Sequence, residues 1–191
     1  MITNAYAYRG DFSSDEGFAG VLAYWKAFCW QIVIAVALSA VVLKKWILVA
    51  WLGNDLSVSQ LDTFAASAGA LTISVIPSLL GFGIGVYALT FAIPSKLVRD
   101  LDKLLTDAVK VGKRKHGSML VLNVDLGYPL VVLAMTLGVG VMQQAFPSVR
   151  PLVCLCWLAF WYSIISLIEI VGVLFRLGEV ALLEKRSENS G

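Results

Sequence analysis

Hydrophobic residues in this chain gather into four long runs, and shorter polar or glycine-containing segments separate them. A helix needs about 20 mostly apolar residues to cross the hydrocarbon core of a bilayer. Each of the four runs reaches that length. The pattern therefore predicts an all-α membrane protein with four transmembrane helices. The predicted crossings are residues 21–43, 64–93, 119–142 and 151–175.

A second, shorter apolar stretch follows the first crossing. Residues 46–52 (WILVAWL) are too few to cross a bilayer. We interpret them as a helix extension or an interfacial turn, with Trp46 and Trp51 at the level of the lipid headgroups, where tryptophan is enriched. Gly53-Asn54-Asp55 then ends the pattern.

The most polar part of the chain lies between the second and third crossings. Leu97, Leu101, Leu104 and Ala108 recur there at helical spacing, and charged residues occupy the other positions. This spacing predicts an amphipathic surface helix. The predicted connecting segments are an N-terminal segment (1–20), a periplasmic or interfacial loop (44–63), the amphipathic helix with a basic loop (94–118), a short loop (143–150) and a tail (176–191).

Composition supports lipid as the solvent for much of this chain. Hydrophobic residues make up 59% of it and charged residues only 15%. Soluble domains run nearer to about 45–50% and 25% respectively. One soluble core of this size would leave too much apolar surface in contact with water.

The distribution of positive charge predicts the orientation. Twelve of the 15 lysine and arginine residues fall in the N-terminal part, the middle segment and the tail. Cytoplasmic loops carry such an excess, so both termini and residues 94–118 are predicted to be cytoplasmic. The three residues on the other side are Lys44, Lys45 and Arg150. Lys44 and Lys45 are the discordant pair, and they make the first crossing the least secure.

The residues that could support catalysis or metal binding are few. Cys29, Cys154 and Cys156 lie in apolar runs, which favours reduced and packed thiols over a disulfide framework. A single histidine, His116, does not make a histidine-based metal site. No catalytic, P-loop or dinucleotide-binding motif occurs, and a lipid-modifying enzyme would need more acids than the runs contain. We therefore expect no enzyme activity, cofactor or metal.

The second crossing holds the least ordinary stretch, Pro77 to Gly85 (PSLLGFGIG). Proline removes a backbone hydrogen bond, and small residues in a G-x-x-x-G pattern let helix backbones approach closely. One interpretation is a tight helix–helix contact. The other is a kink that lines or gates a pore. The candidate residues are Pro77, Ser78, Gly81, Gly83 and Gly85.

The fourth crossing carries a polar stripe. Ser163, Ser166 and Glu169 recur every three residues, and Glu169 is the one acid deep in a membrane run. Ionisable residues at that depth usually face the bundle interior or a water-filled cavity. The stripe could therefore hold helices together or line an ion path.

Two further features lie at the predicted cytoplasmic side. Asn123 and Asp125 near the start of the third crossing are interpreted as helix-start residues or as a vestibule that attracts cations. A basic cluster could bind anionic lipid, a phosphate-rich ligand or nucleic acid. The basic cluster is Lys113, Arg114, Lys115 and His116.

The run PSLLGFGIGVYALTFAI, the charged segment after it and the third crossing that opens MLVLNVD resemble small four-helix bacterial membrane proteins of anti-phage defence systems. The similarity covers roughly residues 70–142, and the membrane components of the Hailong and Kiwa systems are the comparison. The resemblance implies a homo-oligomer, with a tetramer favoured, in the bacterial inner membrane. It implies either an ion-conducting effector or a membrane sensor for a cytosolic partner.

These observations predict a homo-oligomeric, channel-like or pore-forming protein controlled from its cytoplasmic face. The second or fourth crossing is expected to line the axis. The alternative is a non-conducting sensor or anchor subunit that docks a cytosolic effector protein.

Overall fold

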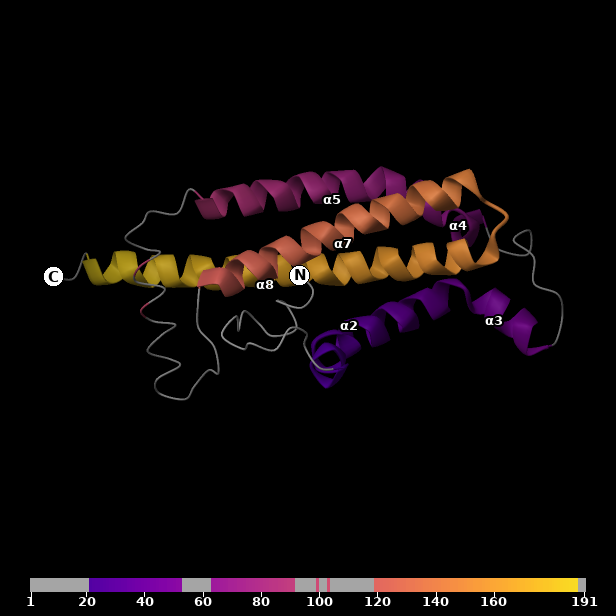
Figure 1. Cartoon of the computed structure of the whole chain (residues 1–191), viewed down its shortest axis with the longest axis horizontal. Coiled ribbons are helices and arrows are strands. Elements are labelled where there is room, and N and C mark those ends of the chain that lie inside the picture. Colours follow the sequence, from indigo (N-terminus) through magenta and orange to yellow (C-terminus); the bar gives the residue numbers. More distant parts are fainter. Residues whose placement is uncertain (1–20, 53–62, 92–98, 100–102, 104–118, 189–191) are drawn as a thin grey trace. The chain divides into compact units, whose positions relative to one another are not determined.

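The computed structural model describes residues 21–52, 63–91, 99, 103 and 119–188. Every element in this part of the chain is an α-helix (Figure 1), which confirms the predicted fold class at that level. The helices are α2 (Val21–Val42), α3 (Lys44–Trp51), α4 (Thr63–Ala66), α5 (Ala68–Phe91), α7 (Met119–Ala145) and α8 (Arg150–Glu188).

Three of these helices are long and apolar enough to cross a membrane. The spans are Ala68–Leu89, Asp125–Ala145 and Arg150–Gly172, of 22, 21 and 23 residues. They identify the chain as a membrane protein. The apolar part of α2, Phe28–Val42, is shorter than these spans. A fourth crossing therefore stays a prediction, and the amphipathic helix expected within 94–118 lies outside the described residues except at Arg99 and Lys103.

Two helix boundaries differ from those expected. The chain around the second crossing is interrupted at Ser67, between α4 and α5, whereas Pro77 lies inside the uninterrupted helix α5. At the other end of the chain, α8 runs on to Glu188, so the tail that begins at residue 176 continues the fourth helix. A helix can continue past Pro77 because only one backbone N–H is missing there.

The chain divides into two compact units. The first consists of residues 1–27, 83–129 and 167–191, and the second of residues 28–82 and 130–166. In the first unit, Val86, Leu126 and Ile170 form a buried apolar cluster. These three residues come from α5, α7 and α8, so one side chain from each helix forms the core of that unit.

The second unit is held together by a close approach of α5 and α7. A Cβ added to Gly140 would lie 2.7 Å from Cγ2 of Thr72, and one added to Gly69 would lie 2.8 Å from the carbonyl oxygen of Gly140. Only glycine leaves room for this contact. Small residues at helix crossings in membranes serve this purpose, because packing contacts replace the hydrophobic effect that drives association in water.

We expect Gly140→Ala to destabilise the protein. The added methyl group would meet Thr72 at 2.7 Å, and overpacking of this kind costs about 1–3 kcal/mol. Gly138→Ala is the matched control, because a Cβ at Gly138 meets nothing within 4 Å. Unfolding in detergent, followed by circular dichroism, should show a lower midpoint for Gly140→Ala alone. Equal unfolding midpoints for the two variants would contradict the close contact between α5 and α7.

Candidate functional site

The interruption at Ser67 is held by side chains from two other helices of the second unit. The Gln143 side chain of α7 accepts a hydrogen bond from the backbone N–H of Gly69 (2.9 Å). The Trp157 indole of α8 donates to the carbonyl oxygen of Ala65 (2.8 Å). The first N–H groups and last carbonyls of a helix lack intrahelical partners. Gln143 and Trp157 thus satisfy backbone groups that the interruption exposes, at a place where water is scarce.

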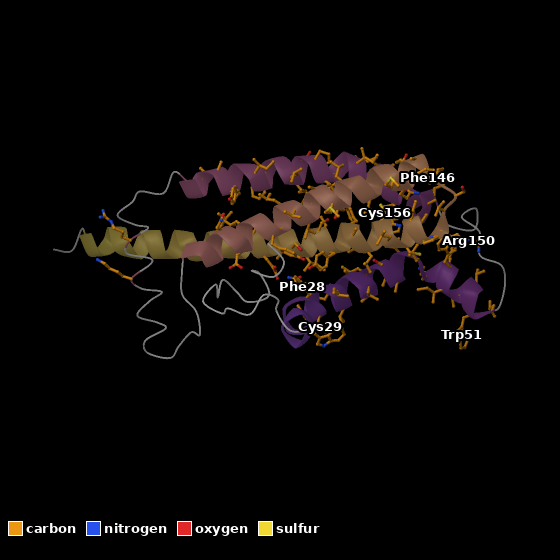
Figure 2. All side chains as sticks on the ribbon, in the orientation of Figure 1. Phe28, Cys29, Trp51, Phe146, Arg150 and Cys156 are labelled. Atoms are coloured by element: carbon orange, nitrogen blue, oxygen red, sulfur yellow. The ribbon has the colours of Figure 1, made fainter. Side chains whose placement is uncertain are left out.

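Further polar and aromatic contacts surround this junction. The Thr72 hydroxyl donates to the carbonyl oxygen of Ala68 (2.8 Å) and lies 3.4 Å from the Cys156 sulfur. The rings of Phe64 and Trp157 are 5.2 Å apart between centroids. Figure 2 shows Cys156 inside the helix cluster. One polar atom beside this cluster is an exception, because the indole nitrogen of Trp161, whose ring stacks on Trp157, is buried without a hydrogen-bond partner among the described residues.

Helix α2 is tied to α8 by a polar contact of its own. The Tyr162 hydroxyl donates to the Gln31 side-chain oxygen (2.8 Å), and Gln31 is only 2% exposed. Ser39 donates to the carbonyl oxygen of Ala35 within α2 (2.7 Å). The hydrogen bond between Gln31 and Tyr162 fixes which face of α2 lies against α8, and it leaves the opposite face apolar.

The predicted candidate residues on α5 do not pack against the rest of the chain, with one exception. Pro77, Ser78, Gly81 and Gly85 are exposed, and Gly83 is buried. A Cβ at Gly81 or Gly85 would meet nothing within 4 Å. Among the described residues, the G-x-x-x-G pair therefore makes no tight contact, whereas Gly69 of the same helix does.

The predicted stripe on α8 faces the interior of the chain at its two serines. Ser163 and Ser166 are buried, and their hydroxyls donate to the carbonyl oxygens of Phe160 (2.8 Å) and Tyr162 (3.0 Å) within the same helix. Glu169 is partly buried, in the first unit. Hydroxyls that are satisfied by their own helix need no water, which favours a packing role for the two serines.

The first unit has a polar group near the start of α7. The Tyr87 hydroxyl of α5 donates to the Asn123 side-chain oxygen (2.6 Å). Asn123 is exposed and Asp125 is partly buried. This contact joins α5 to α7 beside the buried apolar cluster. The basic cluster at 113–116 lies outside the described residues.

Within the described ranges, no group of three or more histidine, cysteine, aspartate and glutamate residues is placed to hold a metal ion. The functional candidates are therefore the exposed face of α5, the partly buried Glu169 and the polar end of the first unit. None of them is a site with converging catalytic groups.

Sequence reasoning missed the residues that organise the second unit. Gln143 was assigned to the loop 143–150, although α7 continues to Ala145 and Gln143 is 1% exposed. A polar residue at the end of an apolar run is ambiguous, because it can leave the membrane or cap another helix. Gly69 and Gly140 could have been recognised as candidates for a close helix contact, because both are small residues within or beside apolar runs.

The chain matches no protein-family model, no curated protein and no solved structure.

We expect Gln143→Leu to loosen the start of α5. It would leave the buried N–H of Gly69 without an acceptor, and such a loss costs about 1–3 kcal/mol. Hydrogen exchange followed by mass spectrometry should show faster exchange in peptides that contain Gly69, together with a lower unfolding midpoint.

Gln144→Leu is the control for this experiment. Gln144 is exposed, its amide nitrogen lies 3.4 Å from the Gln143 oxygen, and leucine keeps the Cγ atom that lies beside Gly69. Exchange at Gly69 that is equally fast in both variants, or unchanged in Gln143→Leu, would contradict the capping role.

Proposed function

We propose that this protein is a homo-oligomeric, channel-like membrane protein in which α5 faces neighbouring copies. The observation that supports it is the exposed, small-residue face of α5. Ser74, Ser78, Gly81 and Gly85 lie on one side of this helix at spacings of three and four residues, and all four are exposed. The two glycines have open space around them.

Such a face is a poor surface for contact with lipid alone. Small residues in membrane helices usually lie where another helix approaches, because close packing provides the attraction that lipid does not. Within the chain, α5 already uses Gly69 for its contact with α7. The second set of small residues is left for a helix from outside the chain. A copy of the same chain, related by closed rotational symmetry, is the simplest such neighbour.

The same symmetry provides a route for ions. A helix from each copy around one axis could line a path with the hydroxyl of Ser78 and with exposed backbone at Gly81 and Gly85. Helix α5 suits this role better than α8, because Ser163 and Ser166 of α8 are buried within one copy. Glu169 would then act at one end of the bundle, as a charge that attracts cations.

The cellular role that we propose rests on the resemblance alone. It is the membrane effector of a bacterial anti-phage defence system, located in the inner membrane as a multi-pass protein with both termini in the cytoplasm, and a tetramer is the favoured assembly. Control would come through residues 94–118, from a cytosolic partner or from a phosphate-rich or nucleic-acid ligand at the basic cluster. No catalytic step is proposed.

The alternative is a non-conducting sensor or anchor subunit. It uses the same assembly and the same cytoplasmic segment, but it docks a soluble effector instead of passing ions. Ser163 and Ser166 are buried within one copy, so their hydroxyls are no longer candidates for lining a pore. This burial favours the alternative.

We expect Gly81→Leu to break or reduce the oligomer without unfolding the single chain. The leucine would fill the space that a neighbouring helix needs, while no described residue lies within 4 Å of the new Cβ. Gly138→Leu is the matched control, since Gly138 of α7 is also exposed with open space. Light scattering after size-exclusion chromatography measures the mass. A monomeric wild-type protein, or equal masses for all three proteins, would rule out the α5 interface.

We expect the purified protein to pass current in planar bilayers. Glu169→Gln removes a negative charge and should reduce the preference for cations, measured as a shift of the reversal potential in a salt gradient. The recordings are made on the purified protein alone. Silence would support the sensor interpretation. A Glu169→Gln variant that changes only the stability of the oligomer would assign Glu169 to helix packing.

A further inference from the structure

One end of the second unit combines exposed positive charge with exposed apolar side chains. Figure 2 shows Trp51, Phe146 and Arg150 at this end, and Phe28 and Cys29 at the other end of α2. Lys44, Lys45 and Arg150 are all exposed here. They are the only charged residues in the described segments 44–52 and 146–152.

Helix α3 follows α2 after a turn at Leu43. The N–H of Leu43 bonds to the carbonyl oxygen of Ser39, and the N–H of Ile47 bonds to that of Leu43. Figure 1 shows that α3 leaves the direction of α2 at this turn. The eight residues of α3 extend about 12 Å, too short to cross a bilayer.

The two tryptophans of α3 have opposite environments. Trp46 is 5% exposed, whereas Trp51 is 88% exposed. The sequence predicted both at the headgroup level, but Trp46 is packed within the chain. Trp46 thus fixes the rotation of α3, and that rotation determines which side chains point away from the protein.

The exposed face of α3 combines apolar side chains with a lysine. Lys44, Leu48 and Leu52 follow one another at steps of four, so they lie on one side of α3 and of the turn that ends it. Leu48 and Leu52 are exposed by 59% and 70%. A lysine ammonium seeks the interface between hydrocarbon and headgroups, so this mixture is typical of a helix that lies at the membrane surface.

We infer that α3 together with Arg150 is a docking surface for anionic phospholipid headgroups. The ammonium groups of Lys44 and Lys45 would lie against lipid phosphates, and Trp51 and Leu52 would enter the boundary between headgroups and acyl chains. Charge complementarity favours an anionic lipid, and the exposed apolar side chains of Leu48, Trp51 and Leu52 favour a lipid surface over a soluble protein. This role also explains why two lysines are tolerated on the side of the membrane that the positive-inside rule leaves poor in charge.

The test is local quenching of Trp51 fluorescence in reconstituted full-length protein. Because the chain has six tryptophans, the Trp51 signal is the difference between the protein and its Trp51→Phe variant. Vesicles of phosphatidylcholine contain a small fraction of either phosphatidylglycerol or phosphatidylcholine that carries a nitroxide near the headgroup. A single lysine near the surface enriches anionic lipid by about five-fold, so labelled phosphatidylglycerol should quench Trp51 severalfold more than labelled phosphatidylcholine.

The double variant Lys44→Gln/Lys45→Gln should lose most of this difference and retain quenching by both labels. Lys103→Gln, which removes an exposed charge from the middle segment, is the control and should retain the difference. Because labelled lipid is present in both leaflets, the result does not depend on the orientation of the protein. Equal quenching by the two labels in the unmodified protein would overturn the proposal. Absence of quenching, or stronger quenching by a label deep in the acyl chains, would also overturn it.

Discussion

The architecture of the second unit depends on one constraint, which is that buried backbone polar groups need hydrogen-bond partners within the protein. The helix interruption at Ser67 exposes such groups on both of its sides. The side chain of Gln143 accepts a hydrogen bond from the N–H of Gly69, and the indole of Trp157 donates one to the carbonyl oxygen of Ala65. These contacts require α7 and α8 to lie against the junction. Gly69 and Gly140 allow the required distance, because a larger residue at either position would separate the helices.

This constraint also determines which side of α5 remains open. With Gly69, Thr72 and Ile76 turned toward the rest of the second unit, the residues two positions further on, Ser74 and Ser78, must point away from it. The stripe of small residues is exposed because the internal contact uses the other face. The assembly that we propose therefore follows from the internal packing as much as from the G-x-x-x-G pattern.

The sequence was sufficient for the fold class and for three of the long helices, because an apolar run of about 20 residues has few alternatives to a membrane helix. It was insufficient for details that depend on partners distant in the chain. Proline at position 77 suggested an interruption, but the interruption occurs at Ser67, where residues of α7 and α8 compensate it. The environments of Trp46 and Trp51 also differ, although both residues lie in one short apolar stretch.

The glycines illustrate why the candidate site was harder to predict than the fold. Gly140 and Gly138 are two residues apart in one helix, yet one touches Thr72 and the other has open space around it. Sequence spacing alone predicts the same role, a close helix contact, for both glycines. In a soluble protein an exposed glycine requires no explanation, but in a membrane helix a row of exposed small residues forfeits packing with lipid. The row on α5 extends from Ser74 to Gly85, whereas the face of Gly138 on α7 has one small exposed neighbour, Ala134, and continues with the larger Val141 and Met142. An extended row provides enough length for a second helix to pack along it, and this length is the physical basis for placing the interface between copies on α5.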